Sequence, residues 1–301
     1  MRSRSDPGLA GRGTDRAQTV HPQRDGRHRP NQLYIVGIGP GSLEHLTLRA
    51  TEVLKSADCV AGYGLYLDLI EPLIAGKQTL RSGMMKEVER VGAAIEAAMD
   101  GRSCALVSSG DPGIYAMAGL VFETCRSRNI PLLRPGAPQD GLGGVPALEV
   151  EVVPGIPALC AGAALLGAPL THDFAVVSLS DLLTPWDVIA ERLEAAARAD
   201  FVVVLYNPKS KKRDWQLAKA QEILLAHRDP ATPVGVVVGA MRANQEVQMV
   251  ALSDLHRSHV DMQTILFVGS RSSSRYLDFM FTPRGYAEKY NIRGPVSPLA
   301  R

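Results

Sequence analysis

Residues 33–42 read LYIVGIGPGS. The first four are apolar strand formers, and glycines at positions 37, 39 and 41 end the strand in a tight loop. Residues 46–57 follow with apolar side chains at the three- and four-residue spacing of a helix that is buried on one face. The segment therefore predicts a strand, a glycine loop and a helix in that order, which is the unit that α/β folds repeat.

Strands and helices alternate along the remainder of the sequence. Further strands are predicted at residues 59–62, 103–108, 148–153, 175–179, 200–206, 233–238 and 264–268, and further helices at residues 88–99, 119–127, 186–197 and 216–227. Such alternation predicts an α/β fold with largely parallel strands, whose ligand sites lie beyond the carboxyl ends of the strands.

Length and loop composition predict two domains. The chain has 301 residues, of which 46% are hydrophobic, enough to build about two buried cores. Pro and Gly are concentrated at residues 135–146, and the segment PGIP at residues 154–157 ends a predicted strand. We place the joint there, which gives an N-terminal α/β domain over residues 33–153 and a C-terminal α/β domain over residues 154–291.

Both ends of the chain have the composition of disordered segments. Residues 1–30 contain seven Arg and three Asp but no apolar run, which argues against a secretory signal. The sequence therefore predicts a disordered basic tail over residues 1–32. Residues 292–301, which hold two Pro and two Arg, are predicted to form a C-terminal tail.

Composition and absent motifs exclude several classes of protein. A net charge of +2 is too small to indicate a nucleic-acid surface, and no apolar run reaches the roughly 18 residues of a membrane helix. The four cysteines lie far apart without a C-x-x-C pair, as is typical of reduced thiols. The sequence contains no Gly-Lys-Ser/Thr phosphate loop, no Gly-x-Ser-x-Gly elbow and no His-Glu-x-x-His. We expect a soluble, cytoplasmic protein that binds no metal, nucleic acid or membrane.

The first glycine loop is open to two interpretations. The dinucleotide-binding fingerprint is G-x-G-x-x-G, and here Ser42 stands in the last position. Pro40 also lacks the N–H that such a loop turns toward a pyrophosphate, and no carboxylate follows the second strand to hold a ribose. A nicotinamide-linked oxidoreductase is therefore the weaker alternative, beside a tight turn that binds nothing.

A second loop, SSGDPGIY at residues 108–115, also ends a predicted strand. Asp111 within it could hold a ribose hydroxyl or an amine of a ligand. It could equally close an Asx turn that caps the following helix. Both interpretations stay open on the sequence.

Polar residues in the second half of the sequence also permit either a structural or a functional interpretation. A lone histidine such as His172 is more often structural than catalytic, and Asp181 has the place of a helix cap. The basic cluster after the strand at residues 200–206 is typical of a solvated face, or of a clamp for a polycarboxylate at the ligand end of the sheet.

Four segments occur in a characteristic order: VGIGPG at 36–41, GDP at 110–112, VVPGI at 152–156 and LYNP at 205–208. With them, the sequence resembles the tetrapyrrole methylase family of S-adenosylmethionine-dependent enzymes over residues 33–291. The resemblance implies a homodimer of two α/β domains of the tetrapyrrole methylase type. It also implies that the cofactor, S-adenosylmethionine, lies in the interdomain cleft.

The resemblance carries over cofactor-binding residues one position at a time. These are Pro40, Gly110, Asp111, Ile114, Pro157, Ala158, Asn207 and Ala240. The sequence departs from the family at Pro157, where Ser or Thr is expected, so a hydroxyl contact is lost at that position.

Within the family, residues 62–70, 108–119 and 172–186 are similar to the members that methylate a corrin precursor at C17. This implies methylation of precorrin-3B at C17 with ring contraction to precorrin-4, a step of cobalamin (corrin) synthesis. The alternatives are the equivalent step on the cobalt-containing substrate, cobalt-precorrin-3, and methylation at a neighbouring corrin carbon. Outside this class, a non-catalytic tetrapyrrole carrier with the same fold is also possible.

Ring contraction requires proton transfer, and a tetrapyrrole substrate carries many carboxylates. His172 and Asp181 lie in the matching second-domain segment, so we expect general acid/base assistance from one of them. The expected substrate-binding residues are basic side chains, namely Arg81, Lys86, Lys209, Lys211 and Arg213.

Overall fold

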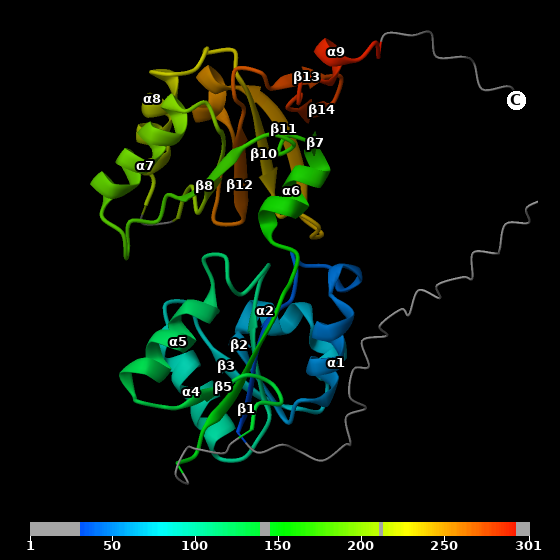
Figure 1. Cartoon of the computed structure of the whole chain (residues 1–301), viewed down its shortest axis with the longest axis vertical. Coiled ribbons are helices and arrows are strands. Elements are labelled where there is room, and N and C mark those ends of the chain that lie inside the picture. The colour runs from blue at the N-terminus through cyan, green and yellow to red at the C-terminus, as the bar shows by residue number, and fades with distance from the viewer. Residues whose placement is uncertain (1–30, 139–144, 211–212, 293–301) are drawn as a thin grey trace, which may run out of the picture.

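The computed structural model describes residues 31–138, 145–210 and 213–292. Most of the predicted N-terminal tail, part of the 135–146 loop, Lys211 and nearly all of the predicted C-terminal tail lie outside the described residues. Figure 1 shows two α/β lobes stacked along the longest axis of the molecule. We refer to residues 31–153 as the N-terminal lobe and to residues 154–292 as the C-terminal lobe.

The strand pairs of the N-terminal sheet are parallel. In spatial order the strands are β3 (Gln78–Ser82), β2 (Cys59–Tyr63), β4 (Cys104–Ser108), β1 (Gln32–Gly37), β6 (Leu148–Val153) and β5 (Leu132–Leu133). The predicted strands match β1, β2, β4 and β6, so the α/β prediction is confirmed. The sequence does not predict β3, because this edge strand reads QTLRS and is largely exposed.

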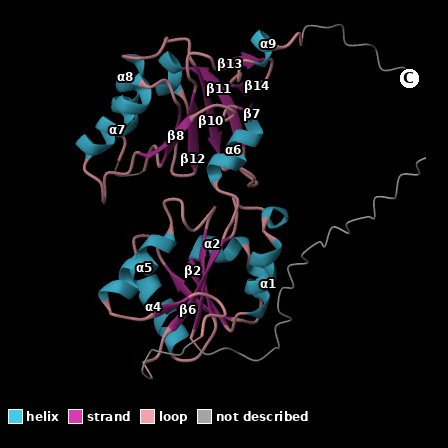
Figure 2. Cartoon of the chain, in the orientation of Figure 1, coloured by secondary structure: helices cyan, strands magenta, loops and turns pink. Residues whose placement is uncertain are grey.

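Helices cover both faces of the N-terminal sheet (Figure 2). Alternate residues of β1 point to opposite faces. Tyr34 and Val36 pack with α1 (Leu48–Ser56), α2 (Gly64–Leu69) and α3 (Glu71–Ile74), whereas Leu33 and Ile35 pack with α4 (Glu87–Met99) and α5 (Met117–Ser127). The short 3-10 helix η1 (Leu43–His45) precedes α1, which begins where the Thr47 side chain accepts a hydrogen bond from the Ala50 N–H at 3.1 Å.

The C-terminal sheet is mixed. In spatial order its strands are β11 (Glu246–Ala251), β10 (Pro233–Val238), β12 (Thr264–Val268), β9 (Val202–Tyr206) and β8 (Phe174–Ser178). In this sheet β8 and β9 pair in parallel, whereas β10 pairs antiparallel with both β11 and β12, and β12 pairs antiparallel with β9.

The expectation of largely parallel strands is therefore wrong in this lobe. A short loop at residues 239–245 joins β10 to β11, and so short a connection permits only an antiparallel pair. The 3-10 helix η2 (Leu252–Arg257), not a crossover α-helix, leads toward β12. The sequence does not predict β11, because this edge strand reads EVQMVA, its first three residues are exposed, and its last three are only partly buried.

Two layers cover the C-terminal sheet. Helices α7 (Trp186–Arg198) and α8 (Gln216–Leu225) pack on one face together with η2. The other face carries α6 (Ala158–Leu166) and a small sheet of β13 (Ser274–Tyr276), β14 (Phe279–Phe281) and β7 (Gly167–Ala168). The last described helix is α9 (Tyr286–Lys289).

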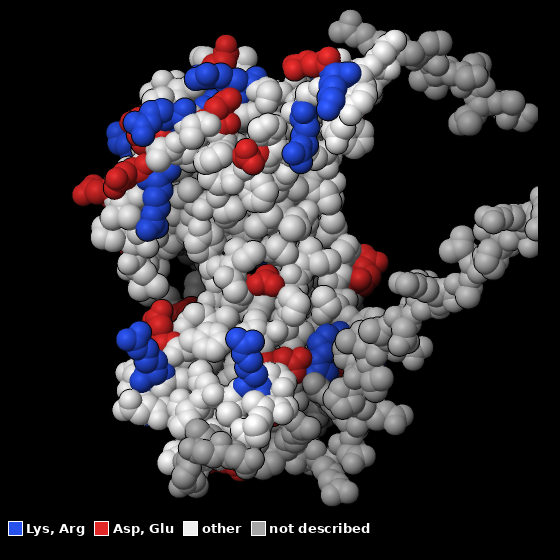
Figure 3. Space-filling view, in the orientation of Figure 1, with Lys and Arg blue, Asp and Glu red and all other residues white. Residues whose placement is uncertain are grey.

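Charges of both signs are mixed on the surface. Figure 3 shows acidic and basic side chains intermingled on the drawn face of the C-terminal lobe, in keeping with the net charge of +2. None of the helices in the described ranges combines the length and apolar character that a membrane span requires. Within the same ranges, no three His, Cys, Asp or Glu side chains are grouped so that they could hold a metal ion.

Arg228 is a buried cation that joins the end of α7 to the strands beside it. Its side chain is 0% exposed, donates to the carbonyl oxygens of Ala197 and Phe201, and lies 3.1 Å from the Asp200 carboxylate.

Arg228→Met is expected to lower the free energy of unfolding by about 3 kcal/mol, because buried acceptors lose their donor. Urea unfolding measures this. Arg257→Met, at an exposed pair, is the control and is expected to cost less than about 0.5 kcal/mol. Equal losses would contradict the prediction.

Candidate functional site

A cavity of about 520 Å³ lies between the two lobes. Its N-terminal wall comes from the carboxyl ends of β1, β2 and β4. Its C-terminal wall comes from the carboxyl ends of β9 and β10, the start of β12 and the beginning of α6. This is where strand direction places ligand sites in α/β proteins.

The loops after β1 and β4 meet beside the cavity. Gly39 N donates to Gly110 O at 3.2 Å, and Gly110 N donates to Gly39 O at 2.7 Å. The segment after β6 packs on them so closely that a Cβ on Gly155 would lie 2.1 Å from Gly110 O, and a Cβ on Gly37 would lie 2.6 Å from that oxygen. Gly37 and Gly155 are therefore required for the close packing of the three loops, and Gly39 and Gly110 for turns with left-handed φ values of 69° and 68°.

Asp111 closes the Asx turn that was one of its two interpretations, and it also lies at the cavity. One carboxylate oxygen accepts a hydrogen bond from Gly113 N at 2.8 Å, which closes an Asx turn. The other accepts from Gly155 N at 3.2 Å and ties the loop to the joint between the lobes. The residue also lines the cavity, so each oxygen retains lone pairs that can accept from a ligand.

Two tyrosines form the wall next to α6. Tyr115 has a left-handed φ of 51°, uncommon outside glycine, and its hydroxyl donates to Val176 O at 3.1 Å in the other lobe. Its ring centroid lies 5.3 Å from that of Tyr206. The Tyr206 hydroxyl accepts from Leu159 N at 2.9 Å, and burial raises the pKa of Tyr206 to about 12, so this phenol is neutral near pH 7.

Asn207 is held from two sides. Its side-chain amide donates to Ser178 Oγ at 2.9 Å, and its backbone carbonyl accepts from Arg213 Nη1 at 2.8 Å. A left-handed φ of 52° explains why Asn, which tolerates this conformation, stands at the end of β9. Arg213 is buried and desolvation lowers its pKa, so it is not a solvated charge. Its hydrogen bond to the carbonyl oxygen of Asn207 positions that residue.

The eight residues that the family resemblance assigns to the cofactor all line this one cavity. They come from five separate segments of the chain: Pro40; Gly110, Asp111 and Ile114; Pro157 and Ala158; Asn207; and Ala240. Their contact with a cofactor stays a prediction.

The two expected proton-transfer residues are placed differently. His172 precedes β8, and Ser178 ends that strand beside the cavity, so the histidine lies about 20 Å from it along the strand. The His172 side chain is 53% exposed, and its ring nitrogen accepts from Asp173 N. The structure therefore does not bring His172 to the cavity. Asp181 follows the end of β8 that is nearer the cavity and accepts from Gln216 Nε2 at 2.9 Å, but it is not among the residues that line the cavity.

The expected substrate-binding bases do not line the cavity among the described residues. Arg81 is bonded to Asp68 at 2.8 Å and Lys86 to Glu89 at 2.6 Å, so nearby carboxylates already compensate both charges. Lys209 is exposed near the end of β9, and Arg213 is buried under Asn207. Lys211 lies outside the described residues.

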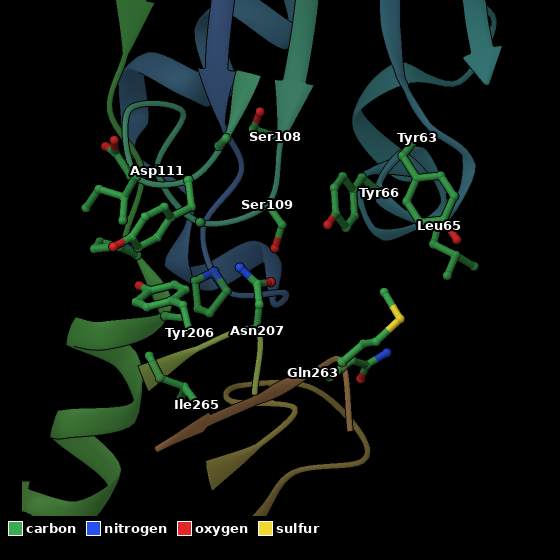
Figure 4. A pocket seen from close by; sticks show the side chains of 18 of the residues that line it. Tyr63, Leu65, Tyr66, Ser108, Ser109, Asp111, Tyr206, Asn207, Gln263 and Ile265 are labelled. Atoms are coloured by element: carbon green, nitrogen blue, oxygen red, sulfur yellow. The ribbon is translucent and has the colours of Figure 1, made fainter. Parts of the chain in front are cut away.

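Sequence reasoning missed the other half of the cavity. Tyr63, Leu65 and Tyr66, which we call the aromatic end, lie at one end of the cavity, and Asp111 and Tyr206 lie at the other (Figure 4). Further lining residues outside the cofactor set include Met84, Glu87, Arg90, Arg242, Met262 and Gln263. The segment 62–70 carried a signal for the aromatic end, because it belongs to the resemblance. No local pattern marks Arg242.

Comparison with known proteins covers both lobes. Residues 32–256 match the family model for Tetrapyrrole (Corrin/Porphyrin) Methylases. A cobalt-factor III methyltransferase of Priestia megaterium is 45% identical over 268 residues, 89% of this chain and 47% of that protein. A probable cobalt-factor III C(17)-methyltransferase of Salmonella typhimurium is 44% identical over 254 residues, 84% of this chain and 99% of that protein. The chain thus spans about half of the first relative and nearly all of the second.

Solved structures agree in fold. The crystal structure of the methyltransferase CobJ has a TM-score of 0.74 at 33% identity, covering 84% of this chain and all of that one. The uroporphyrin-III C-methyltransferase of Thermus thermophilus, solved with S-adenosylhomocysteine, has a TM-score of 0.59 at 25% identity, covering 79% of this chain and 97% of that one. With three quarters of its length inside the family model and a full-length relative at 44% identity, the chain belongs to the tetrapyrrole (corrin/porphyrin) methylase family.

Proposed function

We propose that this chain is an S-adenosylmethionine-dependent C-methyltransferase that methylates a corrin precursor at C17 and contracts its ring. The observation that carries the proposal is that all eight expected cofactor residues line one interlobe cavity. The Salmonella relative, named for C(17) methylation of cobalt-factor III and matched over nearly its whole length, supports the same reaction.

The cavity residues fit an adenosine-containing cofactor. A volume of about 520 Å³ is within the usual range of small-molecule sites. Asp111 offers carboxylate acceptors for ribose hydroxyls or an amine, while Ile114, Ala158 and Ala240 offer apolar surface. The neighbour solved with S-adenosylhomocysteine supports this assignment. When bound, the cofactor supplies an electrophilic sulfonium methyl group.

The residues of the chain then have the tasks of orientation and exclusion of water. A sulfonium methyl needs no activated Ser or Cys nucleophile from the protein, only alignment with the attacking carbon. The three glycine-packed loops and Asp111 form one rigid wall, and the Tyr115 hydrogen bond to Val176 O connects that wall to the opposite lobe. Tyr206, held by Leu159 N, closes the side next to α6.

The mass of the product distinguishes the metal-free substrate from the cobalt-containing one. Purified protein is incubated with S-adenosylmethionine and either metal-free precorrin-3B or the cobalt-containing counterpart, and the products are analysed by mass spectrometry. The names of the two relatives favour the cobalt-containing substrate. We expect one added methyl and an acetyl-bearing contracted ring on at least one substrate. No added methyl on either, despite cofactor binding, would overturn the proposal in favour of a tetrapyrrole carrier or another methylation site.

Thermal protection separates this function from a nicotinamide-linked oxidoreductase. A ligand that binds the folded state raises the melting temperature in proportion to the logarithm of its concentration above Kd. We expect S-adenosylhomocysteine to raise it and NAD to leave it unchanged. Protection by NAD alone would favour the oxidoreductase.

The placement of His172 and Asp181 predicts different effects on turnover. His172→Ala is expected to keep kcat within about twofold of the unmodified protein, because the side chain lies far from the cavity. Asp181→Asn is expected to lower kcat at least about tenfold if this carboxylate moves a proton during contraction. Steady-state rates at saturating substrate measure both. If kcat were normal in both variants, neither His172 nor Asp181 would act as a general acid or base.

We further propose that the protein is a cytoplasmic homodimer, as the family resemblance implies. Light scattering coupled to size exclusion tests the oligomeric state of the full chain. A single monomeric species across the micromolar range would overturn the dimer.

A further inference from the structure

We propose that Arg242 binds a side-arm carboxylate of the tetrapyrrole substrate, at the middle of the interlobe cavity. The inference rests on the proposed function and deepens it by assigning a substrate-binding residue. Arg242 is outside both the cofactor set and the basic residues expected from the sequence.

Arg242 crosses from one lobe to the other. It follows β10 in the C-terminal lobe, and its Nε donates to Pro40 O at 2.8 Å while Nη2 donates to Ser109 Oγ at 3.0 Å. Gly41 leaves room for this path, because a Cβ there would lie 2.5 Å from Arg242 Cγ. Ser109 lies between the two ends of the cavity in Figure 4. The guanidinium is therefore fixed between the cofactor residues and the aromatic end.

The charge of Arg242 has no counter-ion among the described residues. The ion pairs found in those ranges do not include Arg242, and no acceptor in them bonds to its Nη1. Burial lowers the pKa of Arg242, and the nearby phenol of Tyr66 acts in the opposite direction. Placing a cation in a partly desolvated cavity is unfavourable unless an anion compensates it. An anionic ligand group would supply that compensation.

Arg90, the other arginine of the cavity lining, is not available in the same way. It is 6% exposed, and its donors are used by Ser82 Oγ at 2.7 Å, Gly83 O at 2.9 Å and the Met117 sulfur at 3.7 Å. Its guanidinium lies 5.9 Å from the ring centroid of Tyr63. Arg90 therefore supports the aromatic end, whereas Arg242 keeps a donor for a ligand.

The surroundings suit one arm of a macrocycle with carboxylate substituents. Tyr63, Leu65 and Tyr66 present aromatic and apolar surface for the ring, and Arg242 is close enough to Tyr66 for its charge to oppose the burial that raises the pKa of that phenol. Charged hydrogen bonds between guanidinium and carboxylate are strong and directional. The cofactor also carries a carboxylate, so the experiment must separate the two sources.

The test compares Arg242→Gln, which removes the charge but keeps an amide donor, with Arg242→Lys, which keeps the charge. Arg275→Gln, on β13 outside the cavity lining, is the matched control. We measure KM for the tetrapyrrole, kcat, and the Kd of S-adenosylhomocysteine by calorimetry. Arg242→Gln is expected to raise KM roughly tenfold or more, the loss of one charged hydrogen bond, with kcat and the Kd changed by less than about twofold. Arg242→Lys is expected to recover part of the loss.

Two outcomes would overturn the proposal. A Kd for S-adenosylhomocysteine that rises in parallel with KM would assign Arg242 to the cofactor carboxylate or to holding the lobes together. An unchanged KM in Arg242→Gln would show that Arg242 does not bind the substrate and has a structural role only.

A binding measurement without turnover keeps this inference separate from the proposed function. Equilibrium dialysis compares a stable corrinoid polycarboxylate with its methyl ester. The unmodified protein is expected to prefer the free acid, and Arg242→Gln to lose most of that preference. If no substrate is methylated but this preference depends on Arg242, the proposed reaction fails and the carboxylate site stands. If the preference is the same in both proteins, the carboxylate site fails whatever the reaction.

Discussion

Gly155→Ala is expected to separate the three loops at the cavity and to weaken cofactor binding at least about tenfold. The added Cβ would lie 2.1 Å from Gly110 O and 2.8 Å from the carbonyl of Gly37, and every one of these atoms is backbone. No side chain can rotate away, so a loop must move. Overpacking of this kind commonly costs about 1–3 kcal/mol and sometimes more.

The expected shift also breaks the hydrogen bond from Gly155 N to the Asp111 carboxylate. Because Asp111 lines the cavity, the affinity for S-adenosylhomocysteine should fall at least about tenfold, which corresponds to about 1.4 kcal/mol. Calorimetry measures the affinity, and thermal unfolding measures the stability. The two losses have one cause and should appear together.

Gly119→Ala is the matched control. Gly119 lies in α5, and a Cβ there would meet no atom within 4 Å. Alanine is favoured over glycine inside a helix, so this variant should be unchanged or up to about 1 kcal/mol more stable. Normal cofactor affinity in Gly155→Ala would show that the loops have more freedom than these distances allow.

The family resemblance assigns the cofactor residues, and strand direction explains why they come together at one cavity. Pro40, Asp111 and Asn207 each follow a predicted strand, and the carboxyl ends of those strands face the same cavity. The same rule argues against His172, which comes before its strand instead of after it. Resemblance to a family segment suggested that residue, and the direction of β8 places it at the wrong end.

Other features depend on contacts that no local pattern encodes. Arg81 and Lys86 are free cations in the sequence, but folding pairs them with Asp68 and Glu89. Arg242 meets Pro40 across 202 positions of the chain, and the reason for glycine at position 155 is a carbonyl 45 residues earlier. The mixed C-terminal sheet is a further example, because no residue of β11 is fully buried and its first three residues are exposed, so the strand lacks the pattern of a buried strand.

Asp111→Asn is expected to weaken cofactor binding strongly while leaving the fold intact. The amide keeps the shape of the side chain but replaces one accepting oxygen by a donor, so one of the bonds to Gly113 N and Gly155 N is lost. A charged acceptor facing a ligand contributes about 1.5–3 kcal/mol, which predicts roughly a ten- to hundredfold higher Kd for S-adenosylhomocysteine. Because the role we propose for this carboxylate is to bind the cofactor and not to transfer a proton, kcat at saturating cofactor should recover most of its normal value.

Asp229→Asn separates this effect from the turn that Asp111 also closes. Asp229 accepts from Ala231 N at 2.8 Å, the same two-residue Asx turn with the same length, but it precedes β10 at the end away from the cavity. If the turn alone mattered, both variants would lose similar stability and neither would change the Kd. We expect a smaller stability loss in Asp229→Asn, whose remaining amide oxygen can still accept from Ala231 N, with the affinity loss confined to Asp111→Asn. If kcat of Asp111→Asn stayed low at a saturating cofactor concentration, Asp111 would instead be placed at the reacting atoms.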